Sequence, residues 1–285
     1  MRSGEGWKPR PSPEAAAAPL SVRDAVIAGA AQLKAAGSAT PRLDAELLLG
    51  EVLQVGRADL VLGHDQLLAP PDAARYADLL ERRSAHEPVA YILGRREFRH
   101  LTLAVDRRVL IPRPETELLV EAALGLPSGA RVVDVGTGSG AVALALACER
   151  PDLTVTATDV SADALAVARA NGDRLGLDVR FVQADLLEGV PGPWDAVLAN
   201  LPYVARSDSL PADVAEFEPP GALFAGDDGL SVLRRLTGML DGVPFVALEV
   251  GEGQARAVSS LLGEFGQVEC LRDLAGIERV VVGRR

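Results

Sequence analysis

Apolar positions near the start of the chain recur with helical spacing. Over residues 21–86, pairs such as Leu43 and Leu47 stand four positions apart, which places them on one face of a helix. Ser21 followed by Asp24 has the capping-box pattern that begins a helix. The predicted helices cover residues 21–36, a segment that opens at Thr40-Pro41, and 70–83. We therefore expect a small helical-bundle domain over 21–86.

The spacing of apolar residues changes after Pro88. Two apolar runs, Tyr91–Leu93 and Leu101–Val105, flank a charged stretch from Arg95 to His100. This arrangement is typical of two strands joined by a polar turn. It predicts a β-hairpin within residues 87–110 that links two domains.

From residue 111 to 285, short apolar runs alternate with segments of helical period. The predicted helices are 118–124, 141–148 and 162–170, and the predicted strands are 131–135, 154–159, 179–182, 194–199, 245–249, 268–271 and 279–282. Strands that alternate with helices predict an α/β domain, with a parallel sheet covered by helices on both faces. The last two strands are close in sequence, so we expect one of them to run antiparallel in an edge pair.

Composition narrows the classes of protein that fit. A net charge of -11 argues against nucleic acid as a non-specific partner. Two cysteines, Cys148 and Cys270, are too few for a disulfide framework or a zinc site, and we expect no bound metal. Residues 1–20 are rich in Pro, Gly and Ala and predict a flexible tail. We find no signal peptide and no long apolar run, so we expect a cytoplasmic protein without a membrane span.

A glycine-rich turn follows the strand 131–135. In open α/β sheets, ligands bind at the carboxyl ends of the strands, and glycines there allow the backbone to approach a ligand closely. The pattern also fits the dinucleotide motif G-x-G-x-x-G/A, so NAD and S-adenosylmethionine both remain possible ligands, and a tight turn that binds nothing is the simpler alternative. The candidate cofactor-binding residues of this turn are Gly136, Thr137, Gly138, Ser139 and Gly140.

Two acidic residues end the following strands. Asp159 could accept hydrogen bonds from both ribose hydroxyls of a nucleoside, although Asp159 or Ser161 could instead cap the next helix. Asp185 could accept from an adenine amino group while Leu186 packs on the ring, and the alternative for Asp185 is a solvated turn. These three residues, Asp159, Asp185 and Leu186, join the candidate cofactor site.

The turn Asn200-Leu201-Pro202-Tyr203 indicates chemistry on a planar nitrogen. The lone pair of a planar NH2 group is delocalised, so catalysis requires acceptors that fix both N–H bonds and aim the nitrogen at a methyl donor. The Asn200 side-chain oxygen can be one acceptor, and the carbonyl of Leu201 or Pro202 the other. Both acceptors favour the positive charge that develops on nitrogen, and Tyr203 can stack on the planar group. We assign catalysis to Asn200, Pro202 and Tyr203 and substrate binding to all four residues, and Asn200 also faces the cofactor. An ordinary Asn-Pro turn is the alternative.

From about residue 20 onward, the sequence resembles the protein-(glutamine-N5) methyltransferases of peptide-chain release factors, the PrmC/HemK family. Its most family-specific segment is Pro-Arg-Pro-Glu-Thr-Glu. The residues that carry the resemblance are 41–49, 87–94, 96–98, 111–117, the glycine turn, the Asn200 turn, 217–219, 248–249 and 278–280.

The resemblance implies a class I S-adenosylmethionine-dependent methyltransferase domain, Rossmann-like with a seven-stranded, mostly parallel sheet, and an N-terminal bundle that docks the substrate protein. It implies that the substrate is the glutamine of the Gly-Gly-Gln motif in class 1 release factors, and that S-adenosyl-L-methionine is the cofactor. The family usually has Asn-Pro-Pro-Tyr, whereas here Leu201 replaces the first proline. The carbonyl acceptor survives this change, since any residue supplies one.

Three other functions remain as alternatives. Asn-Leu-Pro-Tyr also resembles the turn of ribosomal-RNA adenine dimethyltransferases, and an adenine-N6 methyltransferase acting on RNA or DNA could use the same acceptors on a flipped base. The others are a non-enzymatic protein that keeps the cofactor site, and a dehydrogenase. Nothing in the sequence demands more than a monomer.

Overall fold

The computed structural model describes residues 20–285, so the tail predicted over residues 1–20 lies, apart from Leu20, outside the described residues. The chain divides into two compact units between His86 and Glu87. No helix within residues 20–285 is both long and apolar enough to cross a bilayer.

The first unit is the predicted helical bundle. Its helices are α1 (Val22–Ala35), α2 (Pro41–Leu53), α3 (Arg57–Leu62) and α4 (Pro70–Ser84). Helix α1 begins where predicted because the Ser21 Oγ accepts the Asp24 N–H at 3.1 Å. The Asp24 carboxylate accepts from the Ser21 hydroxyl at 2.7 Å. Fully buried leucines, among them Leu33 and Leu48, form the core of the bundle.

The second unit opens with a short helix and the hairpin. These are α5 (Val89–Leu93), β1 (Arg95–Phe98) and β2 (Leu101–Ala104), and the two strands pair antiparallel. The prediction was therefore right for an antiparallel hairpin within residues 87–110 and for its second strand. It was wrong for the first strand: Tyr91–Leu93 is helical, and the strand forms within the charged stretch that was expected to join the two strands. A short apolar run fits a buried helix as well as a strand. Here Gly94 ends the helix with a left-handed φ of 69°.

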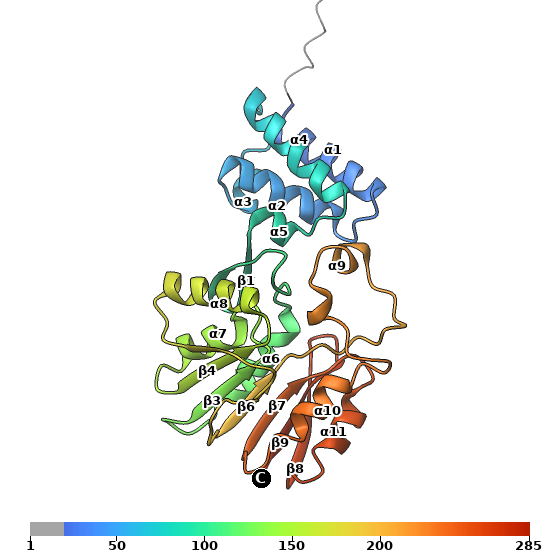
Figure 1. Ribbon diagram of the computed structural model, residues 1–285. Coiled ribbons are helices and arrows are strands. Elements are labelled where there is room, and N and C mark those ends of the chain that lie inside the picture. The colour runs from blue at the N-terminus through green and yellow to red at the C-terminus, as the bar shows by residue number, and fades with distance from the viewer. Residues whose placement is uncertain (1–19) are drawn as a thin grey trace, which may run out of the picture. The chain divides into compact units, whose positions relative to one another are not determined.

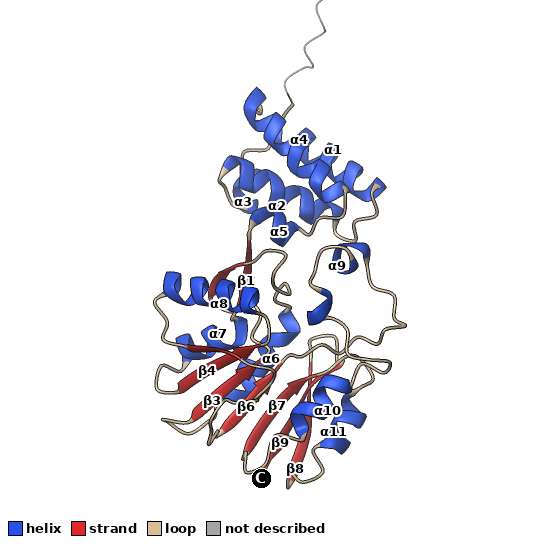
Figure 2. Cartoon of the chain, in the orientation of Figure 1, coloured by secondary structure: helices blue, strands red, loops and turns tan. Residues whose placement is uncertain are grey.

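Seven strands then form one sheet with the order β5-β4-β3-β6-β7-β9-β8 (Figures 1 and 2). The elements of this region are η1 (Pro114–Thr116), α6 (Glu117–Ala123), β3 (Arg131–Val135), α7 (Ala141–Glu149), β4 (Thr154–Asp159), α8 (Ala162–Leu175), β5 (Arg180–Gln183), β6 (Ala196–Ala199), α9 (Ala212–Ala215), η2 (Pro220–Ala222), α10 (Ser231–Thr237), β7 (Phe245–Glu249), α11 (Ala255–Leu261), β8 (Gln267–Arg272) and β9 (Glu278–Arg284). Strand β9 runs antiparallel to both of its neighbours, which confirms the predicted change of direction. Helix α8 continues five residues beyond the expected end at Ala170.

Alternate residues of the central strands enter separate hydrophobic cores. Val132 of β3 belongs to the core that includes α6 and α7. Its neighbour Val133 belongs to the core that includes α10 and α11. This alternation follows from the two-residue period of a strand, and it explains why the strands read as continuous apolar runs.

The topological switch point of the sheet lies between β3 and β6. These two strands are parallel neighbours, with Val135 opposite Ala199. From β3 the chain proceeds to β4 and β5 on one side, and it later crosses to β6 and β7 on the other. The loops that follow β3 and β6 diverge there and leave room for a ligand.

Candidate active site

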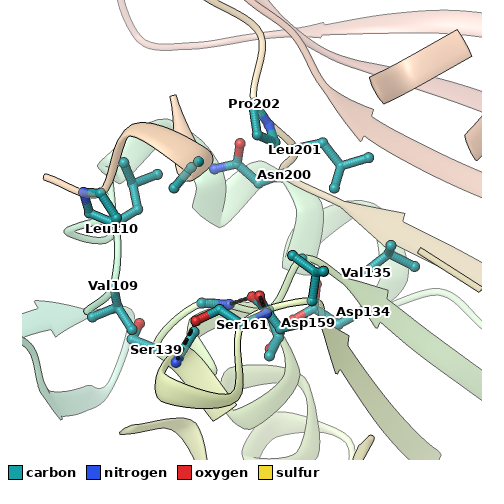
Figure 3. A pocket seen from close by; sticks show the side chains of 18 of the residues that line it. Val109, Leu110, Asp134, Val135, Ser139, Asp159, Ser161, Asn200, Leu201 and Pro202 are labelled. Atoms are coloured by element: carbon teal, nitrogen blue, oxygen red, sulfur yellow. Dashed lines mark hydrogen bonds between the residues drawn. The ribbon is translucent and has the colours of Figure 1, made fainter. Parts of the chain in front are cut away.

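A cavity of about 480 Å³ opens at this switch point (Figure 3). Its volume lies within the range of about 300–1,000 Å³ that is usual for small-molecule sites. All the predicted cofactor residues except Gly140 line it, together with Asn200, Leu201 and Pro202. In Figure 3, Asn200 lies across the cavity from Ser139, Asp159 and Ser161.

The glycine turn requires backbone angles that side chains rarely adopt. The φ angles of Gly136, Gly138 and Gly140 are 75°, 56° and 86°. A Cβ on Gly136 would lie 2.8 Å from the Leu201 Cδ2, whereas a Cβ on Gly138 would meet no atom within 4 Å. Gly136 thus permits the close approach of Leu201, and Gly138 leaves space beside the cavity for a ligand.

Asp134 is a cavity residue that the sequence interpretation did not assign. Its Oδ2 accepts from the Thr137 hydroxyl at 2.6 Å and from the Ala143 N–H at 3.2 Å. Burial raises its pKa to about 7, although these two hydrogen bonds act in the opposite direction. A carboxylate in an otherwise apolar strand was the signal that could have identified it.

Asp159 connects the glycine turn with the start of α8. Its Oδ2 accepts from the Gly138 N–H and its Oδ1 from the Ser161 N–H, each at 2.9 Å. The side-chain cap of α8 is Ser161, whose Oγ accepts the Ala164 N–H at 3.1 Å. Burial raises the pKa of Asp159. The carboxylate therefore lines the cavity, and the capping role belongs to Ser161.

Asp185 and Leu186 line the cavity beyond β5. The Asp185 Oδ2 accepts from the Arg235 guanidinium at 2.8 Å. Leu186 is buried and has a left-handed φ of 56°. Its carbonyl accepts from the Thr158 hydroxyl at 3.0 Å, which fixes the loop at this point.

Asn200 directly follows β6, and its side-chain amide has a defined orientation. The Nδ2 donates to the Thr116 Oγ1 at 3.0 Å, so the Oδ1 is directed away from Thr116. Leu201 is buried beside Gly136, and Pro202 lines the cavity. The carbonyls of this turn follow directly from β6, at the edge of the sheet where the cavity lies.

Tyr203 does not line this cavity. Its ring packs beside Gly251, and its carbonyl accepts from the Gln254 Nε2 at 2.9 Å. Burial, with the negative charge of Glu249, raises the pKa of Tyr203 to about 12. The structure thus brings Asn200, Leu201 and Pro202 to the cavity and places the Tyr203 side chain behind them.

Thr116, which also lines the cavity, and Glu249 are two buried polar residues beside Asn200. They are 4% and 2% exposed. Glu249 ends β7, the parallel neighbour of β6, and its Oε2 has no hydrogen-bond partner. Burial raises its pKa to about 7, opposed by interactions with the Thr116 and Tyr203 side chains. The signal in the sequence was a charged residue at the end of an apolar strand.

Asn171 of α8 connects the hairpin to the glycine turn. Its Oδ1 accepts the Ala104 N–H at 2.8 Å. Its Nδ2 donates to the carbonyls of Ala104 and Ser139, each at 3.0 Å. A fully buried amide with three backbone partners fixes all three segments relative to one another.

Two loops on another side of the cavity are joined by the buried carboxylate of Glu218. This carboxylate forms an ion pair with Arg113 and accepts the Ile111 N–H at 3.1 Å. The adjoining residues Pro112 and Pro219 line the cavity. Burial raises the pKa of Glu218, and the Arg113 guanidinium opposes that effect.

The fold and the cavity define a class I methyltransferase: a seven-stranded sheet with one antiparallel strand and a glycine turn at its switch point. The chain matches two family models, the PrmC N-terminal domain over residues 24–94 and the methyltransferase small domain over residues 114–217.

Curated relatives identify the family. The chain is 45% identical to the release factor glutamine methyltransferase of Bordetella pertussis, over 85% of this chain and 94% of the relative. It is 40% identical to the protein of the same name from Deinococcus radiodurans, over 93% of this chain and 99% of that one. The chain belongs to the release factor glutamine methyltransferase family.

A solved structure gives the same fold. A methyltransferase from Pyrococcus furiosus matches with a TM-score of 0.50 and 18% identity, over 74% of this chain and 98% of that one. A release factor-specific protein-(glutamine-N5) methyltransferase from Alicyclobacillus acidocaldarius is 32% identical, with a TM-score of 0.39, over 61% of this chain and 94% of that one.

Proposed function

We propose that the chain transfers a methyl group from S-adenosyl-L-methionine to the side-chain amide nitrogen of the glutamine in the Gly-Gly-Gln motif of class 1 release factors. The observation that carries this proposal is the position of Asn200, across the cavity from the glycine turn and with its Nδ2 turned toward Thr116. The names of the relatives support the choice of a release-factor glutamine.

The residues of the cavity fit S-adenosylmethionine. Open space beside Gly138 could receive the part of the ligand that approaches the backbone most closely. The Asp159 carboxylate could accept from the ribose hydroxyls, and Asp185 with Leu186 could contact the adenine. When bound, the cofactor supplies an electrophilic methyl group.

The protein's own contribution is to orient the substrate nitrogen. The Asn200 Oδ1 accepts one amide N–H, and a carbonyl of Leu201 or Pro202 accepts the other. The two acceptors stabilise the positive charge that develops on nitrogen as the new bond forms. The nitrogen then loses a proton to water, so a strong general base is unnecessary. Tyr203 supports the turn from behind rather than by stacking on the amide, since its side chain lies outside the cavity lining.

Adenine in RNA or DNA is the second planar nitrogen that these acceptors could bind. That reaction requires a flipped base and contacts to phosphates. A net charge of -11 opposes such contacts. We therefore prefer the protein substrate.

A labelled-methyl transfer assay tests the choice. Wild-type protein is incubated with radiolabelled S-adenosylmethionine and one of three acceptors: a release factor, the same factor with its Gly-Gly-Gln glutamine changed to alanine, or ribosomal RNA. We expect label on the first acceptor alone. Label on RNA alone would replace the proposal with the adenine alternative, and label on the glutamine-to-alanine factor would move the reaction to another residue.

A further inference from the structure

We propose that Thr116 and Glu249 are positioning residues that set the orientation of the Asn200 amide, so that its oxygen rather than its NH2 group faces the substrate. This inference rests on the proposed function, because it specifies how that site distinguishes a donor from an acceptor.

Three side chains from different segments meet at one wall of the cavity, which Thr116 and Asn200 line. Asn200 follows β6, Glu249 ends the neighbouring strand β7, and Thr116 ends the η1 turn. The only hydroxyl proton of Thr116 has two possible acceptors here, Asn200 and Glu249. The Asn200 Nδ2 donates to the Thr116 Oγ1 at 3.0 Å, and the Thr116 side chain also interacts with the Glu249 carboxylate.

The order of donors and acceptors among these three side chains fixes which group of the Asn200 amide faces Thr116. An ionised carboxylate can only accept, so in its interaction with Glu249 the Thr116 hydroxyl is the donor. The Thr116 oxygen is then an acceptor, and Asn200 must present its NH2 group to it. The Asn200 Oδ1 is consequently the group that can accept an N–H from a substrate amide. An amide turned the other way would present N–H to N–H, which is repulsive.

Protonation of Glu249 would remove this preference for one orientation of the Asn200 amide. A protonated carboxyl group can donate to Thr116, and Thr116 could then donate to the Asn200 Oδ1. The groups that face Glu249 include Thr116, Tyr203, Glu115 and Arg279. Glu115 raises the pKa of Glu249 further, while Arg279 lowers it. Burial is the largest influence and brings the pKa to about 7, so the orienting effect strengthens as pH rises through about 7 and weakens as pH falls through it.

Matched variants of Thr116 separate orientation from packing. Thr116→Val keeps the shape but loses the hydroxyl, and Thr116→Ser keeps the hydroxyl but loses a methyl group. We expect Thr116→Val to lower kcat about fivefold, the change that corresponds to the about 1 kcal/mol of one buried hydrogen bond, with an unchanged cofactor Kd. Thr116→Ser should restore most of kcat. Equal kcat losses in the two variants would assign Thr116 to packing alone and overturn the proposal.

The pH dependence of kcat tests Glu249 at saturating cofactor. We expect kcat of the wild type to fall as pH is lowered through about 7, and that dependence to disappear in Glu249→Gln. Asp134→Asn is the matched control, because Asp134 is another buried carboxyl group whose pKa is raised to about 7. In this control, kcat should still fall as pH is lowered through about 7. The same fall of kcat in Glu249→Gln would contradict the proposal.

A measurement without substrate separates this proposal from the proposed function. The side-chain NH2 signals of Asn200 in a ¹⁵N NMR spectrum are assigned by their loss in Asn200→Ala. We expect them to shift with pH near 7 in the wild type and to remain constant in Glu249→Gln. This result does not depend on which acceptor is methylated. Signals that change neither with pH nor in Glu249→Gln would refute the orientation mechanism itself.

Discussion

Asn200 and Asp159 face the same cavity from different strands, and their partners assign them different tasks. Asp159 accepts from backbone N–H groups of the glycine turn and of α8, at the side of the cavity where a cofactor would contact the backbone. Asn200 is oriented by Thr116 on the opposite side. Substitutions at the two positions should therefore change different kinetic quantities.

Asn200→Ala should lower kcat far more than it weakens cofactor binding. The variant loses an acceptor that stabilises charge in the transition state, and the loss of such a group lowers kcat by about 10²- to 10³-fold. Single-turnover methyl transfer gives the rate, and calorimetry gives the cofactor Kd. Equal losses in rate and in affinity would remove the assigned role.

Asp159→Ala should chiefly weaken cofactor binding. Hydrogen bonds to a charged group contribute about 1.5–3 kcal/mol, so the Kd should rise roughly ten- to hundredfold. Asp173→Ala is the control, since Asp173 is an exposed acid on α8, the helix that follows Asp159. An unchanged Kd in Asp159→Ala would refute the ribose assignment.

Among individual residues, the sequence predicted those that belong to a local motif, and it missed those that only the fold brings together. The glycine turn, Asp159 and Asn200 each stand at the end of a predicted strand. Thr116 and Glu249 are far apart in the sequence and meet only because their segments adjoin β6. The Tyr203 side chain was expected to stack on the substrate, yet the chain direction after Pro202 places its ring beside Gly251.

At the scale of elements, the turn after β3 and the turn after β6 depend on each other. Leu201 stands where the family usually has proline, and its side chain occupies the space that a Cβ on Gly136 would need. The two turns therefore tolerate substitution only as a pair.

Gly136→Ala should destabilise the protein more than Gly138→Ala. Both residues have a positive φ, which costs an L-residue about 1–2 kcal/mol. Only the Gly136 Cβ would also collide with Leu201, and overpacking adds about 1–3 kcal/mol. Urea unfolding of both variants measures the difference.

The double variant Gly136→Ala with Leu201→Ala provides the control for that experiment. Removing the leucine side chain should eliminate the steric part of the cost, so the two substitutions should be non-additive. Additive free energies of unfolding would show that the clash is absent in solution.

The short helix α5 is an element whose type could not be predicted from the sequence pattern. Its run of apolar residues is too short for its period to distinguish a helix from a strand. Tertiary contacts decide it: the Tyr91 hydroxyl donates to the Val109 carbonyl at 2.6 Å. The strands of the large sheet were predictable because their apolar runs are bounded by turn residues, and because β3 and β4 are each followed by a segment of helical period.

At the scale of the whole molecule, buried carboxyl groups should determine how stability varies with pH. Burial raises the pKa values of Asp134 and Glu249 to about 7. Between the ordinary carboxyl pKa and 7, the folded state binds more protons than the unfolded state at these two sites. Their contribution to stability is thus present at low pH and is lost as pH rises through 7.

Other carboxyl groups act in the opposite sense. Ion pairs with arginine lower the pKa values of Glu46, Glu149 and Asp106. Their contribution is present at neutral pH and is lost in acid. We expect the two effects to produce a maximum of stability on the acid side of neutrality, measured by urea unfolding of the cofactor-free protein.

Asp134→Asn and Glu249→Gln should flatten the pH dependence between about 5 and 8. These variants remove the groups that titrate in that range and leave the arginine-paired carboxylates intact. A wild-type protein whose stability rises steadily from pH 5 to 8 would contradict the expected burial of both carboxyl groups.

Asn171 has a consequence for hydrogen exchange. The Ala104 N–H lies on the edge of a two-stranded hairpin, where amides ordinarily exchange quickly with solvent. Here its partner is the Oδ1 of a fully buried side chain that also contacts the Ser139 carbonyl of the glycine turn. Exchange at this one amide requires Asn171 to move. Its rate therefore reports how often α8 and the glycine turn separate from the hairpin, and a bound cofactor that orders the turn would slow it.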